Sequence, residues 1–222
     1  MKIIEVKNLI KSFKSGEEEL RVLKGISLEV NKGEFISITG RSGSGKSTLL
    51  YQLGLLDHPN SGEILIDGVD VTKLDHDERT RFRLEELGYV FQDYALVPEL
   101  TAIENVAIPI MMQGKPKKEA FRISEGALER VGLKERLNNL PSKLSGGEQQ
   151  RVSIARAIAH NPKIIFADEP TANLDSETAD TVLETFLDLH KQGQTIVMVT
   201  HEPEYARLTD RILKLADGLI EI

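Results

Sequence analysis

Short, continuous runs of apolar and β-branched residues are the feature of this sequence that most restricts its fold. Four of them, FISIT, YVF, IIFA and IVMVT, lie at residues 35–39, 89–91, 164–167 and 196–200. Runs without alternating polar residues are typical of strands buried on both faces of a parallel sheet. Helical patterns separate these runs, as in a β-helix-β chain order. The sequence therefore predicts an α/β fold with a mainly parallel sheet at its core.

Two further regions are expected beside this core. Strand-like pieces at 3–6, 20–23, 26–30 and 62–66, with turn residues between them, predict a small antiparallel β subdomain near the N-terminus. Residues 101–142 are mostly helical in pattern, with one amphipathic helix expected between Pro116 and Gly132. We expect one domain over 1–222, with the α/β core and β subdomain at about 1–92 and 150–222 and an inserted α-helical subdomain at about 95–149.

The bulk composition excludes several classes of protein. The chain of 222 residues has 28 Lys and Arg against 35 Asp and Glu, a net charge of −7, which disfavours sequence-independent nucleic-acid binding. It has no cysteine, so disulfides and thiolate metal sites are excluded. No apolar run reaches the ~18 residues of a membrane-spanning helix. We expect a cytoplasmic chain without a membrane span of its own.

Each of the four apolar runs leads into polar residues. Gly40 follows the first run, Gln92 the second, Asp168 and Glu169 the third, and His201 the fourth. Ligands of open parallel sheets bind outside the carboxyl ends of the strands. This edge of the predicted sheet is therefore the expected binding site.

The first strand end carries the pattern G-x-x-x-x-G-K-[ST] of a phosphate-binding P-loop, between a strand and a helix expected at 48–56. Its glycines let backbone N–H groups approach phosphates, and Lys46 can reach the β- and γ-phosphates. The expected nucleotide contacts are Gly40, Arg41, Ser42, Gly43, Ser44, Gly45, Lys46, Ser47 and Thr48. The alternative is a flexible Ser/Gly turn that happens to precede a lysine.

The adjacent carboxylates at the third strand end need a cation, because an unpaired buried carboxylate is costly. If the Ser47 hydroxyl holds Mg²⁺ on a nucleotide, Asp168 is expected on the same ion. Successive residues of an extended chain point apart, so Glu169 can instead orient a water for attack; a surface salt bridge is its alternative. Gln92 and His201 are candidates to hydrogen-bond the γ-phosphate or that water, although a single histidine is more often structural.

A second glycine motif, LSGGEQQRVSIARAI at 144–158, opens another helix. Ser145 and Glu148 have the spacing of a capping box, which by itself predicts only a well-capped helix. A capping box does not require Gly146 and Gly147, and bare N–H groups at a helix N-terminus favour anions. The motif predicts a second phosphate-binding element, whose partner the residues alone do not identify.

Taken together, these motifs resemble those of the nucleotide-binding subunits of ABC transporters. The similarity covers essentially the whole chain and keeps the order of the family's motifs. The matching segments are Walker A GRSGSGKST, the Q-loop glutamine Gln92, the signature LSGGEQQ, Walker B KIIFADEP, the D-loop ANLD with Asp175, and the switch histidine His201.

The resemblance implies ATP and Mg²⁺ as ligands and a head-to-tail homodimer with two ATPs between the chains. It implies catalytic roles for Lys46, Gln92, Glu169 and His201, with Glu169 similar to the family's general base. Metal contacts are implied for Ser47, Gln92 and Asp168, and nucleotide contacts for Phe13, Ser145, Gly146, Gly147 and Asp175. Ser145 and Gly147 are expected at the partner's γ-phosphate. Phe13 matches the family's adenine-stacking aromatic, which is commonly tyrosine; a packed core aromatic is its alternative.

Three segments resemble the sequences of one subgroup, the lipoprotein-releasing, macrolide-export and cell-division ABC ATPases. These segments are LGLLDHPNSGEILIDG, LVPELTAIENV and FADEPTANLDS. This subgroup implies a separate integral-membrane permease and a position on the inner face of the cell membrane. Three alternatives stay open: a soluble ABC ATPase acting on nucleic acid or ribosomes, a P-loop small-molecule kinase, and a regulatory partner that binds ATP without turnover. The one compact basic cluster, at 115–118, is explained by a solvated helix start.

Overall fold

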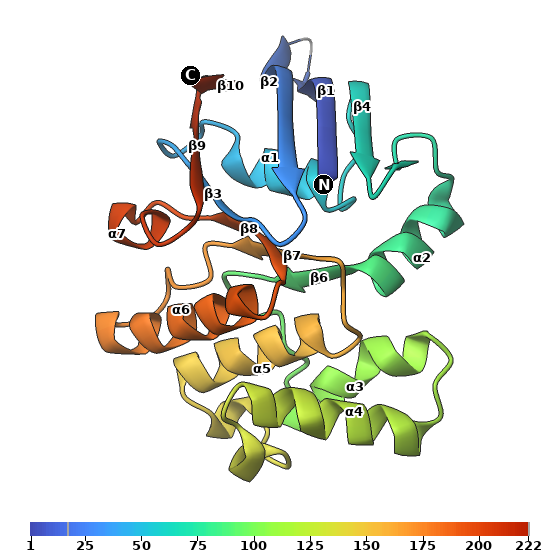
Figure 1. Ribbon diagram of the computed structural model, residues 1–222, viewed down its shortest axis with the longest axis vertical. Coiled ribbons are helices and arrows are strands. Elements are labelled where there is room, and N and C mark those ends of the chain that lie inside the picture. Colours follow the sequence, from blue (N-terminus) through green and yellow to red (C-terminus); the bar gives the residue numbers. More distant parts are fainter. Residues whose placement is uncertain (17, 222) are drawn as a thin grey trace. The chain divides into compact units, whose positions relative to one another are not determined.

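The computed structural model describes residues 1–16 and 18–221 (Figure 1). The chain divides into two compact units, the first formed by Met1–Arg81 with Gly193–Ile222 and the second by Phe82–Gln192. Helix α2, His76–Glu86, carries the chain from the first unit to the second.

The first unit contains an antiparallel sheet in the order β2-β1-β4-β5, as expected for the N-terminal region. Its strands are β1 (Lys2–Ser15), β2 (Glu18–Asn31), β4 (Ser61–Ile66) and β5 (Val69–Asp70). The sequence predicted separate pieces at 20–23 and 26–30, but these are one long strand. The pairing of β1 with β2 shifts register near Asn8 and resumes beyond it, with Asn8 and Gly25 at φ values of 47° and 94°. The irregularity is a bulge, and the strands continue through it.

A second set of strands in the first unit has the order β10-β9-β3-β8. Strand β3 (Phe35–Thr39) lies parallel to β8 (Thr195–Val199) and to β9 (Arg211–Ala216), and β10 (Leu219–Glu221) lies antiparallel to β9. Helix α1 (Lys46–Leu53) follows β3, and α7 (Pro203–Ala206) follows β8. The sequence analysis did not include β9, because its buried Leu213 and Leu215 alternate with exposed residues.

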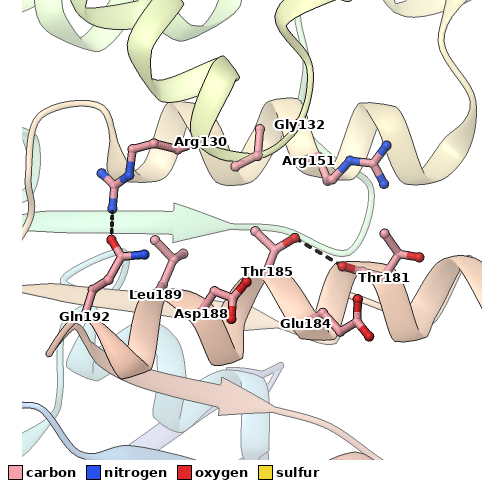
Figure 2. A pocket seen from close by; sticks show the side chains of 10 residues that line it. Arg130, Gly132, Arg151, Thr181, Glu184, Thr185, Asp188, Leu189 and Gln192 are labelled. Carbon is pink, nitrogen blue, oxygen red and sulfur yellow. Dashed lines mark hydrogen bonds between the residues drawn. The ribbon is translucent and has the colours of Figure 1, made fainter.

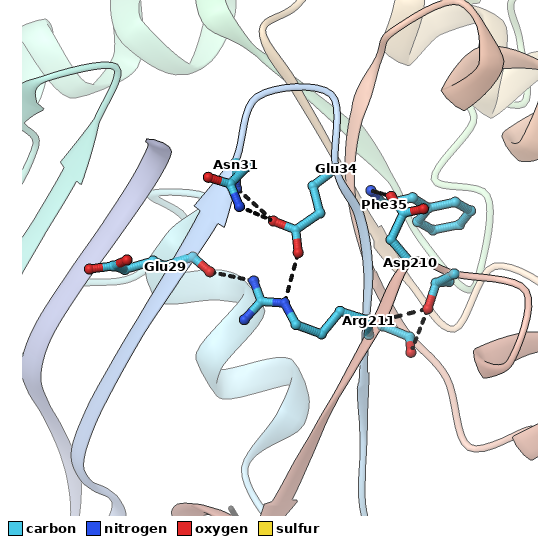
Figure 3. Close-up of polar contacts among 8 residues, drawn as sticks. Glu29, Asn31, Glu34, Phe35, Asp210 and Arg211 are labelled. Carbon is cyan, nitrogen blue, oxygen red and sulfur yellow. Dashed lines mark hydrogen bonds and ion pairs between the residues drawn. The ribbon is translucent and has the colours of Figure 1, made fainter. Parts of the chain in front are cut away.

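Polar contacts fasten the start of β3 to the start of β9 (Figure 3). The Arg211 guanidinium lies 2.7 Å from a Glu34 carboxylate oxygen and donates to the Glu29 carbonyl at 2.5 Å. The Phe35 amide donates to Asp210 at 2.9 Å, and the Asp210 amide donates back to the Phe35 carbonyl at 2.8 Å. These contacts fix the end of β3 that is remote from the P-loop.

The second unit pairs two parallel strands, β6 (Leu87–Val90) and β7 (Ile164–Asp168). Figure 1 shows α3 (Ala102–Met112), α4 (Lys117–Arg130) and α5 (Gly146–Ile158) packed together in this unit, with α6 (Ser176–Lys191) beside α5. Short 3₁₀ turns at Lys134–Arg136 and Pro141–Lys143 connect α4 to α5. With parallel pairs in both units, the predicted α/β fold is confirmed.

Most expected element limits hold within one or two residues. Helix α4 begins after Pro116 and ends before Gly132, and Ala127 and Leu128 of its predicted apolar face are buried. The limits of α1 and β6 differ from the expected ones. Helix α1 begins at Lys46 and not at Thr48, because its N-cap is the left-handed Gly45, and it ends at Leu53 and not at 56. Strand β6 ends at Val90 and not at 91, because the Phe91 carbonyl accepts a turn hydrogen bond from Tyr94 N at 3.2 Å.

Gly88 of β6 marks a close approach between this strand and α5. A Cβ at residue 88 would lie 2.4 Å from the Ala157 carbonyl oxygen and 3.1 Å from the Pro162 ring. Gly126 offers a matched contrast, because it lies inside α4 and no described atom comes within 4 Å of its Cβ position. The same change therefore has opposite consequences at the two positions.

Gly88→Ala is expected to lower the free energy of unfolding by about 1–3 kcal/mol, since α5 must move away from β6. Gly126→Ala is expected to raise it by roughly 0.5–1 kcal/mol through better helix propensity. Urea unfolding followed by circular dichroism measures both values. Equal effects of the two substitutions would contradict the close approach of β6 and α5.

Candidate functional site

Parallel pairing in the first unit brings the P-loop and His201 to the same edge of the sheet. Ile38 of β3 lies opposite Val199 of β8, and the Thr200 amide donates to the Ile38 carbonyl at 3.2 Å. The P-loop therefore leaves β3 beside the point where the chain leaves β8 towards His201.

The second unit repeats this arrangement with the other two strand ends. Val90 of β6 lies opposite Ala167 of β7, so that Gln92 and the two carboxylates follow adjacent parallel strands. The sequence-predicted residues thus fall into two groups, with Phe13, the P-loop and His201 in the first unit. Gln92, Asp168, Glu169, Asp175 and the glycine motif belong to the second.

Lys46 is a buried cation at the start of α1, with 7% of its surface exposed. Its ammonium donates to the Gly40 carbonyl at 3.1 Å and to the Arg41 carbonyl at 3.3 Å. Among residues 1–16 and 18–221 it has no carboxylate partner. A buried charge without a counter-ion is costly, so the local chemistry favours an anionic ligand.

The loop around Lys46 fits phosphate groups in two further respects. The Ser44 hydroxyl oxygen is buried without a hydrogen-bond partner in the described structure. Gly45, the N-cap of α1, has a left-handed φ of 101° and supplies no side-chain cap to the first turn of the helix. A buried hydroxyl without a partner, a helix start without a side-chain cap and an ammonium without a carboxylate partner together suit a polyphosphate.

Phe13 and His201 both lie near the surface of the first unit. The Phe13 side chain is 44% exposed, which excludes the alternative of a packed core aromatic. The Nε2 atom of His201 lies 3.0 Å from a Glu202 carboxylate oxygen, and half of the histidine side chain is exposed. Both side chains are accessible to a ligand.

The two carboxylates of the third strand end differ in environment. Asp168 is the last residue of β7 and is 7% exposed, whereas Glu169 is half-buried just beyond the strand. Glu169 has a φ of 44°, in the left-handed region that non-glycine residues rarely adopt. Such strain persists where the surrounding structure fixes it, and it clusters at functional sites.

Side chains of α5 and of the loop after β7 hold the Gln92 loop in place, and the sequence analysis missed them. Buried Gln150 donates to the Pro170 carbonyl at 2.6 Å and to the Phe91 carbonyl at 3.3 Å. Asn173 donates to the Gln92 carbonyl at 3.0 Å. Arg156 donates to the Tyr94 carbonyl at 2.9 Å and to Ala95 O. Gln150 and Arg156 lie in LSGGEQQ and the helix that it opens, and Asn173 lies in ANLD, but no local pattern identified the partners of these side chains.

The glycine motif of α5 has the predicted capping box. The Glu148 amide donates to the Ser145 hydroxyl at 3.2 Å, and the Ser145 amide donates to the Glu148 carboxylate at 2.8 Å. The glycines also have a packing reason that the sequence did not suggest. A Cβ at Gly147 would lie 2.1 Å from the Thr178 methyl, and one at Gly146 would lie 3.0 Å from the Tyr94 hydroxyl.

Asp175 forms the N-cap of α6. It accepts hydrogen bonds from the Thr178 amide at 3.0 Å and from the Thr178 hydroxyl at 2.8 Å. The hydrogen bond from the Thr178 amide lowers the pKa of Asp175 below its usual value. This capping role by itself accounts for an aspartate at position 175.

Two of the hollows among the described residues each lie within one unit. One, of about 400 Å³, is lined by the P-loop residues 40–44 and by residues 214–217 and 221. The other, of about 320 Å³, lies between α6 and the helices α4 and α5 of the second unit (Figure 2). Figure 2 shows Arg130 and Arg151 on one side of this groove and Glu184 and Thr185 on the other, and none of the predicted site residues lines it.

Neither a metal cluster nor a membrane span was found in the described part of the chain. Residues 1–16 and 18–221 contain no group of three or more His, Asp or Glu placed to hold a metal ion. Within the same residues, no helix is both long and apolar enough to cross a bilayer.

Known proteins share both the sequence and the fold. The profile of the ABC transporter family matches residues 23–172. The chain is 51% identical over 218 residues to the lipoprotein-releasing system ATP-binding protein LolD of Aquifex aeolicus (strain VF5), covering 98% of this chain and 96% of LolD. It is 45% identical to the macrolide export ATP-binding/permease protein MacB of Shewanella sp. (strain ANA-3), covering 98% of this chain but 33% of MacB.

Among solved structures, the dimeric post-hydrolysis state of the ATP-binding cassette MJ0796 bound to ADP and Pi is similar. Its TM-score is 0.91 at 43% identity, with 99% of this chain and 97% of that chain covered. The family profile, the relative that matches at full length and the strand-loop-helix that carries the P-loop agree. The chain therefore belongs to the ABC transporter family, as one of its ATP-binding, ATP-hydrolysing cassettes.

Proposed function

We propose that this cassette binds MgATP, closes head to tail with a second copy of itself, and uses hydrolysis to drive a separate membrane permease. The single observation that carries the proposal is Lys46, a buried ammonium with only carbonyl partners at the base of the P-loop. A triphosphate supplies the negative charge that this ammonium lacks. The Ser44 hydroxyl and the N–H groups at the start of α1 supply further donors.

Mg²⁺ favours oxygen ligands and is usually bound by one or two carboxylates together with substrate phosphates. Ser47, Asp168 and Gln92 are the proposed protein ligands, and the ion would supply charge neutralisation at the phosphates. Ser47 lies in the first turn of α1 and Asp168 ends β7, so these two proposed ligands sit on regular elements, whereas Gln92 lies in the loop after β6.

Glu169 is the proposed general base. Its carboxylate accepts a hydrogen bond from the attacking water and then takes the proton of that water. The left-handed backbone at Glu169 and the Gln150 hydrogen bond to the adjoining Pro170 support a fixed carboxylate. His201 and Gln92 are proposed to hydrogen-bond the γ-phosphate from the ends of β8 and β6. Hydrolysis then depends mainly on positioning and charge stabilisation.

The dimeric form of the similar cassette MJ0796 supports a homodimer for this chain. We propose that Ser145, Gly146 and Gly147 of one copy approach the γ-phosphate bound by the other. The Ser145 hydroxyl accepts a hydrogen bond from Glu148 and still has a proton to donate. Asp175 is proposed to contribute at the same interface. Hydrolysis removes the shared γ-phosphate, and the dimer opens.

The relatives named for lipoprotein release and macrolide export support a permease partner of that class. We propose a position on the inner face of the cell membrane, in contact with this permease. The helical subdomain at about 95–149 is proposed to pass the movement of the dimer to it, while about 1–92 and 150–222 form the ATPase core with its β subdomain.

Lys46→Met is expected to weaken ATP binding roughly 10- to 100-fold, since a charge-assisted contact is lost. The ligand-free protein should be as stable as the wild type or more stable, because an uncompensated buried charge disappears. Thermal shift and calorimetry with and without ATP measure both properties, with exposed Lys32→Met as the control. Undiminished affinity would contradict a phosphate contact of Lys46.

Glu169→Gln is expected to keep ATP affinity and to slow turnover roughly 10²–10⁴-fold, because the amide cannot take a proton from water. The slowed variant should accumulate as an ATP-dependent dimer, detected by light scattering after gel filtration. Glu177→Gln, which alters an exposed carboxylate on α6, should behave as the wild type. Normal turnover in Glu169→Gln would remove Glu169 from the mechanism.

Ser145→Arg is expected to abolish ATP-dependent dimers in the Glu169→Gln background, because bulk and charge replace a hydroxyl at the proposed interface. Each monomer should still bind ATP. Ser145→Ala serves to separate this effect from loss of the helix cap, which costs about 1 kcal/mol. Ser142→Arg, three residues earlier and exposed, should dimerise normally. Dimers that persist in Ser145→Arg would rule out the head-to-tail arrangement.

A further inference from the structure

A buried lysine lies directly against Phe13. Lys11 of β1 is 9% exposed, and its ammonium nitrogen lies over the Phe13 ring, 4.9 Å from the ring centroid. This distance is within the roughly 6 Å of a cation–π interaction. The Phe13 side chain is nevertheless 44% exposed. The ring therefore has one face occupied by a cation and remains open to a ligand elsewhere.

Hydrogen bonds fix the position of Lys11. Its ammonium lies 2.7 Å from a carboxylate oxygen of Asp57 and donates to the His58 carbonyl at 2.7 Å. Asp57 also accepts from the His58 amide at 2.7 Å and from the buried Gln52 side chain at 3.0 Å. Burial opposes ionisation of Asp57, but the hydrogen bonds from Lys11 and the His58 amide outweigh it and lower its pKa.

This network connects Phe13 to the helix that carries the P-loop lysine. Gln52 lies on α1, Asp57 follows α1, and the first residue of the helix is Lys46. Arg79, 2% exposed, donates to the Asp57 backbone carbonyl at 2.7 Å and secures the same turn from α2. All these residues belong to the first unit. Hydrogen bonds of Asp57 therefore connect Lys11, beside the Phe13 ring, to the helix that begins at the P-loop lysine.

The charge on Lys11 affects what can stack on the ring. A cation over one face attracts the π electrons of the ring, so the other face becomes less negative. A purine base brings its own π electrons, and it is repelled less by such a face. Phe13 has no hydroxyl with which to hydrogen-bond a base, so stacking carries the whole interaction.

We propose that Lys11 is a positioning residue for the nucleotide base: held by Asp57 and Gln52, it polarises and orients the Phe13 ring for stacking on adenine. The proposal rests on the proposed function in one respect: the bound ligand is ATP, whose adenine lies against Phe13 as the family resemblance implies. The alternative is a purely structural role, in which Lys11 and Asp57 form only a buried ion pair that maintains the fold.

The two alternatives differ in which part of the nucleotide is affected. Calorimetry on the full chain in EDTA, where turnover is absent, compares the affinity for ATP with that for inorganic tripolyphosphate. Lys11→Met should weaken ATP binding about three- to tenfold, the range of a partly desolvated cation–π contact. The affinity for tripolyphosphate should be unchanged, because that ligand has no base.

Matched variants guard against misfolding. Lys11→Met leaves Asp57 without its partner, so Lys11→Met/Asp57→Asn removes both charges together and should give the same selective loss. Lys11→Arg keeps the cation and should restore most of the ATP affinity. Lys7→Met breaks an exposed pair with Glu63, 3.5 Å apart on the same sheet, and should change neither affinity. Unfolding midpoints verify that each variant is folded.

Phe13→Ala separates this inference from the proposed function. If Phe13→Ala weakens ATP binding and Lys11→Met does not, Phe13 keeps its assignment and the role of Lys11 is wrong. Unchanged ATP affinity in Phe13→Ala would overturn both. Adding Lys11→Met to Phe13→Ala should cause no further loss, since no ring remains to polarise. Equal losses of affinity for ATP and for tripolyphosphate in Lys11→Met/Asp57→Asn would show that the ion pair only maintains the fold, and would overturn the proposal.

Discussion

Parallel pairing of adjacent strands is the constraint on which the candidate site depends. Because β3 and β8 run in the same direction, the P-loop and His201 must leave their sheet at one edge. The pairing of β6 with β7 does the same for Gln92 and the two carboxylates. Contacts such as the ion pair between Arg211 and Glu34 hold the opposite end of β3, so the loop end alone is left to bend around a ligand. The direction of the strands therefore determines which side chains lie at the same edge of the sheet and can act on one ligand.

Helix α5 has the corresponding role inside the second unit. Its first turn presents the glycine motif, its middle places Gln150 between the loops after β6 and β7, and Arg156 secures the chain beyond Gln92. Gly88, which has no side chain, allows this helix to pack closely against β6. One helix thus connects a proposed partner-facing tip with the loops that carry Gln92 and Glu169.

Elements and motifs whose signal lies within a few consecutive residues could be predicted from the sequence. Contacts between residues far apart in the chain could not. The continuous core runs, the P-loop and the capping box of Ser145 could be found because their signals lie within a few residues. Strand β9 was missed because it is half-buried and alternates, and a register bulge at Asn8 disguised the length of β1 and β2. The partners of Gln150 lie 59 and 20 residues away in the chain, and no local pattern specifies them.

The contact between Gly147 and Thr178 has a mechanical consequence. A methyl group of Thr178 occupies the volume that any larger residue at position 147 would need. The first turns of α5 and α6 are therefore packed closely against each other. Asp175 accepts two hydrogen bonds from Thr178 and so fixes the position of Thr178 in this contact. A displacement of the α5 tip towards α6 is therefore met by the Thr178 side chain in the first turn of that helix. If the tip contacts a nucleotide as proposed, this contact couples the nucleotide to α6.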